Sequence, residues 1–433
     1  MDSLLKLESS AQLAPATVAG TLGISLLVYV LLVRSLRWRR YNAIHRQYEA
    51  KWKEGKLSVA EAQKVMHVSS LYDMPWLLVR ALSFALFKTY AVPDVSKLLL
   101  QTRQLGSGAK VAKRYADTEI LIQTWIGCPI NGFFDPKISP DEKRPAEDPR
   151  ASIAIARTNF IHSKYKTITN DQYLFTLGLF IMEPAAWAER FGWRSLSPME
   201  KDAFFIFWKD VGEKMGITDI PKTLKELSDW CDNYAEANMV PNETNKEVAY
   251  HTTQELICAV PEAFGLKAFA ERVVITLLDD KLRVAFMLPK QPRILHRVVA
   301  ALLTTVGLFQ GYLCLPRADN DSKGYPIDYN LPKPDASGDI RQRPAVYRSV
   351  PWYAPVPTGV LSRFWNNLLV SVGWYKTLPS AEFFPKGYRL EEIGPRSFEN
   401  VGIDQVMLEA AKIQGCPITG PWQSKTSGKG LSY

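Results

Sequence analysis

The sequence lacks the paired cysteines of a disulfide-bonded protein. Its five cysteines are widely spaced and include no C-x-x-C pair; they are Cys128, Cys231, Cys258, Cys314 and Cys416. A disulfide scaffold or a zinc ribbon is therefore not predicted. We expect reduced thiols in a domain that faces the cytosol.

Several common catalytic and binding patterns are also missing. The chain has no glycine-rich phosphate loop, no G-x-S-x-G elbow and no cysteine-thiolate haem motif. Its net charge of +9 is spread along the chain without a nucleic-acid-binding motif, so nucleic acid is not an expected partner. Sustained alternation of apolar and polar residues is absent too, which predicts an all-α fold.

One long uncharged segment stands near the N-terminus. Residues 13–33 form a run of 21 residues, and a helix needs about 20 to cross a bilayer. Four arginines follow at once, ending at Arg40, which predicts that the short segment 1–12 faces the lumen and the rest faces the cytosol. A cleaved signal peptide would carry its basic residues before the apolar run, so we expect a single-pass anchor that contacts membrane lipids.

The remaining chain is divided by composition and helix-capping signals. Residues 34–74 are expected to form a basic stalk and linker helices, residues 75–400 an all-α domain, and residues 401–433 a tail. Capping boxes at Ser58 with Glu61 and at Ser197 with Glu200 predict two helix starts. Pro184 is expected to interrupt a helix, 264–288 to form one helix, and 127–149 to form a long surface loop.

Three later apolar segments require a separate interpretation. Residues 74–92 are interrupted by Arg80 and Lys88, which favours a core helix over a second span. Residues 295–315 are long enough to span, but basic residues at both ends give no clear orientation, so an in-plane or buried helix is expected. Residues 360–378 are predicted to form a second surface-lying helix.

The segment 151–165 contains the one histidine between His67 and His251. Asp148 and Pro149 predict a helix that begins near Arg150 and carries His162 on a mostly apolar helix. A lone histidine is more often a core residue than a ligand, and neither a nearby second histidine nor a Glu-x-x-His pattern supports a zinc or di-iron site. If His162 binds a metal, haem iron is the best candidate, because haem needs a single proximal protein ligand.

Segments along the chain resemble a known family. KRYADTEILI (113–122), ARTNFIHSKY (156–165), WCDNYAEANMVP and FFPKGYRLEEIGP resemble the fungal MpaB-type oxygenases bound to the endoplasmic reticulum. More distantly the chain is similar to the latex-clearing rubber oxygenases, which are all-α and bind haem b through one histidine. The resemblance covers about residues 75–400. It implies a haem-dependent oxygenase in the endoplasmic reticulum membrane that uses O₂ to cleave a double bond in a prenyl chain of a meroterpenoid or related secondary metabolite.

The resemblance also implies roles for individual residues. His162 matches the proximal haem ligand, and Arg157 in the same segment is a second candidate cofactor-binding residue. Arg114 and Thr118 repeat an arginine–threonine spacing found near the haem of the rubber oxygenases. With the intervening Asp117 they are the candidate catalytic residues. Asp117 stands where those enzymes carry a lysine, and no glutamate matches their possible base, so their distal chemistry does not transfer.

Alternatives remain at this point. Arg114 could act on bound oxygen, or it could pair with a haem propionate or with Asp117. His251 could face the distal side of an iron or the solvent. A non-catalytic membrane scaffold or lipid-handling helical protein would explain the anchor and the apolar helices, although it would not explain the match around His162.

Overall fold

The computed structural model describes residues 15–102, 108–133, 147–318, 325–336 and 338–423, and in these ranges the predicted all-α fold is confirmed. No β-strand occurs among them, and pairing is limited to two isolated bridges. The expected loop 127–149 lies mostly outside the described residues. The α-helices are α1 (Pro15–Lys53), α2 (Val59–His67), α3 (Pro75–Thr89), α4 (Pro93–Gln101), α5 (Gly108–Gly127), α6 (Arg150–His162), α7 (Asn170–Phe191), α8 (Pro198–Lys214), α9 (Leu224–Asn238), α10 (Glu243–Leu256), α11 (Leu266–Leu277), α12 (Asp280–Ala285), α13 (Arg293–Leu313), α14 (Val360–Ser371) and α15 (Ile403–Gln414).

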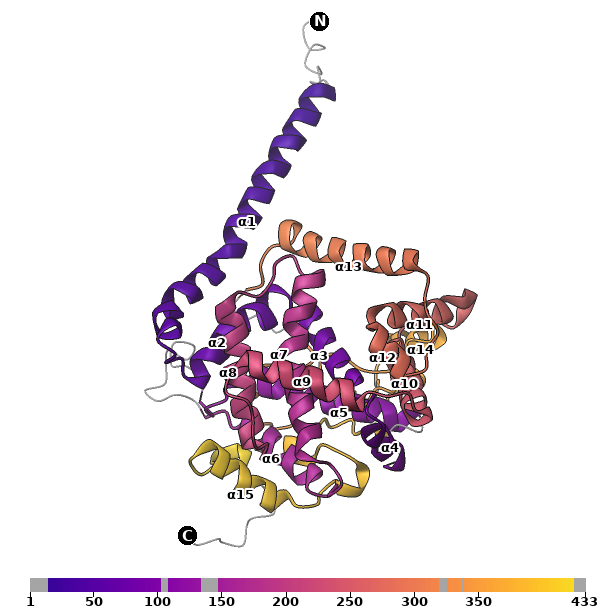
Figure 1. Ribbon diagram of the computed structural model, residues 1–433. Coiled ribbons are helices and arrows are strands. Elements are labelled where there is room, and N and C mark those ends of the chain that lie inside the picture. The colour runs from indigo at the N-terminus through magenta and orange to yellow at the C-terminus, as the bar shows by residue number, and fades with distance from the viewer. Residues whose placement is uncertain (1–14, 103–107, 134–146, 319–324, 337, 424–433) are drawn as a thin grey trace, which may run out of the picture.

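A single helix contains both the predicted anchor and the first part of the stalk. The N-terminal half of α1 projects away from the other helices (Figure 1). Its leucines face outward, with Leu22 65% and Leu27 59% exposed. In the described part of the chain, α1 and α13 are the two helices long and apolar enough to cross a membrane. The structure thus has a helix suited to anchoring at the N-terminal end.

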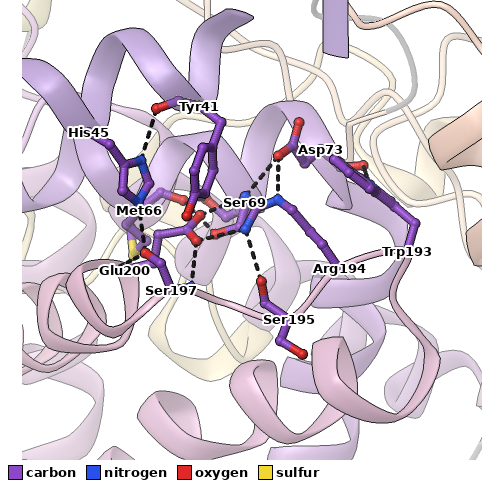
Figure 2. Close-up of polar contacts among 11 residues, drawn as sticks. Tyr41, His45, Met66, Ser69, Asp73, Trp193, Arg194, Ser195, Ser197 and Glu200 are labelled. Atoms are coloured by element: carbon purple, nitrogen blue, oxygen red, sulfur yellow. Dashed lines mark hydrogen bonds and ion pairs between the residues drawn. The ribbon is translucent and has the colours of Figure 1, made fainter. Parts of the chain in front are cut away.

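The C-terminal half of α1 is fastened to the domain by a buried polar cluster (Figure 2). Arg194 donates two hydrogen bonds of 2.7 Å to the carboxylate of Glu200 and one of 2.8 Å to Asp73. Beside them, Nε2 of His45 on α1 lies 2.8 Å from Oγ of Ser197. These ion pairs lie within the domain, and removing one partner of such a buried pair typically costs about 3–5 kcal/mol. Helix α1 contacts the cluster through His45 and through Tyr41, whose ring centre lies 4.7 Å from the Arg194 guanidinium carbon.

Helix α6 lies in the core and begins at Arg150, as predicted. Ala151, Ala154 and Ala156 are fully buried, and their small side chains let α5 and α15 pack closely on either side. Pro149, and not Asp148, stands at the N-cap position. The Asp148 carboxylate accepts a hydrogen bond of 3.3 Å from the backbone N–H of Arg150 and bonds of 2.8 and 2.9 Å from the Arg150 guanidinium.

The segment after residue 400 differs from the expected tail. It contains α15, which packs against α6 and buries Val406 and Ala410 completely. These two residues are four positions apart and lie on the buried face of an amphipathic helix. The helical domain therefore continues past residue 400.

The other helix predictions have mixed outcomes. Both capping boxes are confirmed, and α3 is a core helix. The expected interruption at Pro184 is wrong, because α7 continues through this buried proline while packing along α3. The single helix expected over 264–288 is two helices, α11 and α12, because Asp279 caps α12 and starts a new helix there.

Candidate functional site

A cavity of about 240 Å³ lies among helices α3 to α8. Its wall is mainly apolar, with leucine, isoleucine and aromatic side chains from α3, α4, α5, α7 and α8, while α6 contributes Thr158 and His162. A second cavity of about 140 Å³ lies beside it, towards the C-terminal segment. Four polar residues line both cavities: Arg114, Thr118, Thr158 and His162. The structure therefore brings together three of the five residues that the sequence singled out.

His162 is the last residue of α6, and its ring lies 5.2 Å from the ring of Tyr173. Neither ring nitrogen has a hydrogen-bond partner among the residues that the structure describes. Burial, together with the smaller effect of the Arg114 charge, lowers the pKa of His162 to about 4. The imidazole is therefore neutral at physiological pH. A neutral ring with an unengaged nitrogen at a cavity wall is a suitable metal ligand.

Arg114 and Thr118 lie one turn apart on α5 and face the same cavity, as their spacing predicts. The guanidinium of Arg114 also interacts with the hydroxyl of Tyr90, a cavity residue that sequence reasoning missed. Burial raises the pKa of Tyr90, and the neighbouring arginine only partly offsets this effect. Tyr90 therefore stays a neutral hydrogen-bonding group beside a permanent positive charge.

Asp117 lies on the wall of the smaller cavity, but its carboxylate is already paired. It accepts hydrogen bonds of 2.7 Å from the Lys113 ammonium and 2.6 Å from the Tyr353 hydroxyl. The same ammonium donates to the carbonyl of Gly394 over 2.6 Å. These contacts connect α5 to the C-terminal segment. A catalytic role for Asp117 stays a prediction, and this geometry supports a positioning role instead.

Arg157 lies on α6 but lines neither cavity. Its guanidinium donates hydrogen bonds of 2.6 to 3.0 Å to the carbonyls of Ile393, Phe398 and Val401. Burial lowers the pKa of Arg157 to about 10, so the side chain remains charged. It fastens the C-terminal segment to α6. Its cofactor-binding role remains a prediction, and His251 on α10 also lies outside the two cavity walls.

Two buried tryptophans on the cavity wall were not anticipated. The rings of Trp125 on α5 and Trp208 on α8 are 6.3 Å apart and nearly perpendicular. Neither indole N–H has a hydrogen-bond partner in the described part of the chain. An unsatisfied buried donor costs about 1–3 kcal/mol, so such groups often mark a site that a ligand completes. In sequence both residues read as ordinary core aromatics.

The protein ligands present fit a haem better than a bare metal ion. Among the described residues, no three histidine, cysteine, aspartate or glutamate side chains converge on one point. Haem supplies four of its own ligands and needs one from the protein. The wall offers that nitrogen at His162, an arginine able to pair with a carboxylate, two unpaired indole donors and an apolar enclosure.

Comparisons with known proteins identify the family. The model of the catalytic domain of the ER-bound oxygenases mpaB and mpaB′ and of rubber oxygenase matches residues 150–307. ER-bound oxygenase mpaB of Penicillium roqueforti is 32% identical over 282 residues, which are 60% of this chain and 88% of that protein. The chain belongs to the mpaB family of ER-bound oxygenases.

One of two further relatives extends the match over nearly the whole chain. ER-bound oxygenase mpaB′ of Penicillium brevicompactum is 28% identical over 417 residues, or 90% of this chain and 91% of that protein. The mpaB protein of the same organism is 31% identical over 249 residues, or 54% of this chain and 59% of that protein. The chain is therefore an oxygenase, and the ER-bound character of its relatives fits the apolar half of α1. The matched catalytic domain includes His162 but not Arg114 or Thr118.

Proposed function

We propose that this mpaB-family protein is a haem-dependent oxygenase in which His162 is the proximal iron ligand. The observation that supports this proposal most strongly is the neutral imidazole of His162, without a hydrogen-bond partner in the described chain, on the wall of an apolar cavity. The bound haem would supply an iron atom able to bind and activate O₂. Arg114, Trp125 and Trp208 are the residues available to its polar groups.

The proposed reaction is the oxidative cleavage of a carbon–carbon double bond in a prenyl chain, such as the farnesyl chain of a meroterpenoid. Cleavage to two carbonyl groups is balanced with O₂ alone: the double bond breaks, and each new carbonyl takes one oxygen atom. No external electron donor is needed for this outcome. Leu98, Leu121 and Phe180 provide the apolar contacts that an isoprenoid requires.

The polar wall residues have distinct proposed roles. Arg114 is a permanent positive charge next to the reacting space, so it can stabilise negative charge that develops on oxygen. Thr118, one turn further along α5, can donate a hydrogen bond to the same region. The apolar residues around them exclude water, which strengthens both interactions. Arg114 also favours the neutral form of His162, since its charge opposes protonation of the ring.

We also propose that the protein is a single-pass protein of the endoplasmic reticulum membrane with a cytosolic domain. The arginines that follow the apolar half of α1 support this orientation. A glycosylation acceptor inserted after residue 40 should remain unmodified in cells. Modification of that acceptor would reverse the proposed topology.

The purified full-length protein tests the proposed reaction. It should contain iron, absorb in the Soret region, and convert a farnesylated phenol into shorter carbonyl products under air but not under nitrogen. With ¹⁸O₂, both fragments should carry one labelled oxygen. A protein that turns over without iron or a Soret band would contradict the haem assignment. A haem protein that leaves the prenyl chain intact would contradict the substrate assignment alone.

A further inference from the structure

An apolar surface outside the cavity has no partner in the described chain. It comprises the outward faces of α13 and α14 with the start of α11, and we call it the apolar platform. Its exposed residues include Ile294 (66%), Leu302 (62%), Phe309 (55%), Phe269 (52%), Leu361 (80%) and Phe364 (62%). Figure 1 shows α13 lying across the end of the domain from which the N-terminal half of α1 projects, with α11 and α14 near its far end.

The opposite face of α13 is packed against the domain. Leu295, Val299, Gly307 and Gly311 recur every four or eight residues and are buried. The two glycines allow close contact: a Cβ on Gly307 would meet the Phe191 carbonyl at 2.3 Å, and one on Gly311 would meet the side chain of Trp193 at 2.5 Å. The domain therefore covers one side of α13 along its length. The in-plane expectation is thus favoured by the packing.

Contacts with α1 fix the position of α13 relative to the apolar half of α1. The Tyr29 hydroxyl donates to the carbonyl of Leu313 over 2.8 Å. Two turns further along α1, the Arg37 guanidinium donates to the carbonyls of Gln310 and Cys314 over 2.7 and 2.6 Å. These contacts lie at the boundary between the uncharged part of α1 and the arginines that follow it. The end of α13 therefore lies at the level where α1 leaves the proposed membrane.

The charges around the platform also suit a membrane surface. Acidic residues number 44 in the whole chain, yet none occurs in residues 281–318 or 340–381, which contain α13 and α14. Helix α11 carries one, Glu271, whose carboxylate accepts a hydrogen bond from Gln254. Exposed basic residues border the apolar faces, including Arg293 and Arg297 on α13 and Arg363 on α14. Basic residues beside an apolar helix face favour the anionic cytosolic leaflet.

We propose that the apolar platform of α13, α14 and α11 docks in the plane of the cytosolic leaflet of the membrane that α1 crosses. This inference rests on α1 being an anchor and is independent of the haem and the reaction. The platform then holds the domain against the bilayer in one orientation. A lipophilic substrate dissolved in that leaflet would meet the enzyme at a fixed face.

Fluorescence quenching in vesicles tests the proposal with the full-length chain. Single cysteines replace Leu302 on α13, Phe364 on α14, and Leu26 in the anchor as a positive control. The matched negative control is Leu408→Cys, an exposed leucine (45%) on α15, which lies at the opposite end of the domain (Figure 1). Each variant is labelled with an environment-sensitive nitrobenzoxadiazole dye and reconstituted into phosphatidylcholine–phosphatidylserine vesicles with or without doxyl-labelled lipids. Unsubstituted protein, labelled in parallel, corrects for the native cysteines.

The proposal predicts loss of emission with doxyl lipids at positions 26, 302 and 364 and none at 408. Quenching at 26 without quenching at 302 and 364 would overturn the platform and leave the anchor intact. Unquenched but water-shielded dyes at 302 and 364 would indicate a protein partner or a second copy, which also overturns it. Absence of quenching at all positions would overturn the anchor and the platform together.

Discussion

His67 and His162 are two enclosed histidines whose pKa values are lowered alike but whose surroundings differ. Burial lowers the pKa of each to about 4. Nε2 of His67 lies 2.7 Å from the carbonyl of Ile126, so that ring is held by a backbone acceptor. His162 has no such partner in the described chain and faces a cavity beside Arg114. Burial alone therefore does not distinguish a structural histidine from a candidate ligand, whereas the hydrogen-bond partner does.

The largest expected effect is that of His162→Ala. This change removes the proposed iron ligand, so oxygenase turnover should fall to background. It removes no hydrogen bond of the described chain, so the free energy of unfolding should change by only about 1 kcal/mol. Turnover assays and urea titrations in detergent would measure both quantities. Full activity of His162→Ala would show that turnover does not need this imidazole, and His162 would then be a structural residue like His67.

Arg114→Ala should produce the next largest loss. Removing one preorganised donor typically raises a reaction barrier by about 3 kcal/mol, or roughly 100-fold in rate. Arg114→Lys retains the charge and should lose less. Iron content should remain measurable in both variants, since His162 is unchanged. Equal activity of the alanine, lysine and unsubstituted proteins would show that Arg114 does not act in the reaction.

Acid should destabilise the protein through both histidines. Each folded pKa is about 4, below the usual value of 6.5, so the unfolded chain takes up protons first as the pH falls. Their stabilising contribution is complete above pH 6.5 and declines between pH 6.5 and 4. At pH 5 each histidine should have lost about 2 kcal/mol. Urea titrations at pH 7.5 and 5 would measure this loss in the free energy of unfolding. The variant His67→Gln lacks one of the two imidazoles and should lose less. An unchanged loss in that variant would contradict the prediction.

The smallest expected effect is that of His67→Ala at neutral pH. It deletes the hydrogen bond to Ile126 and should lower the free energy of unfolding by about 1–2 kcal/mol. Turnover per folded molecule should stay within a few-fold of the unsubstituted protein. Loss of iron from this variant at native-like stability would mean that the two histidines had been assigned the wrong way round.

The sequence was sufficient to predict the helical class and the N-terminal apolar helix, and it singled out the segment around His162, which the structure places at the cavity wall. Spacing also placed Arg114 and Thr118 on one face of a helix, since that depends on local geometry alone. It did not reveal what Asp117 and Arg157 bind, because their partners at Tyr353 and Ile393 lie more than 200 residues away in the chain. Nor could it distinguish the unsatisfied indoles of Trp125 and Trp208 from ordinary core aromatics.

The surface helices show the same limit. Residues 295–315 passed the length test for a membrane span, and the structure adds that Gly307 and Gly311 bring one face of α13 into close contact with the domain. Such a contact depends on tertiary structure. Hydrophobicity along the chain does not encode it.

The most direct test of the account is chemical rescue of His162→Gly. Iron content and the Soret spectrum of this purified variant would be recorded with and without added imidazole, beside His67→Gly as the matched control. The account predicts that His162→Gly loses haem or shifts its Soret band, that imidazole restores the spectrum, and that His67→Gly retains it throughout. An unchanged iron content and spectrum in His162→Gly without imidazole would contradict the assignment of His162 as the ligand.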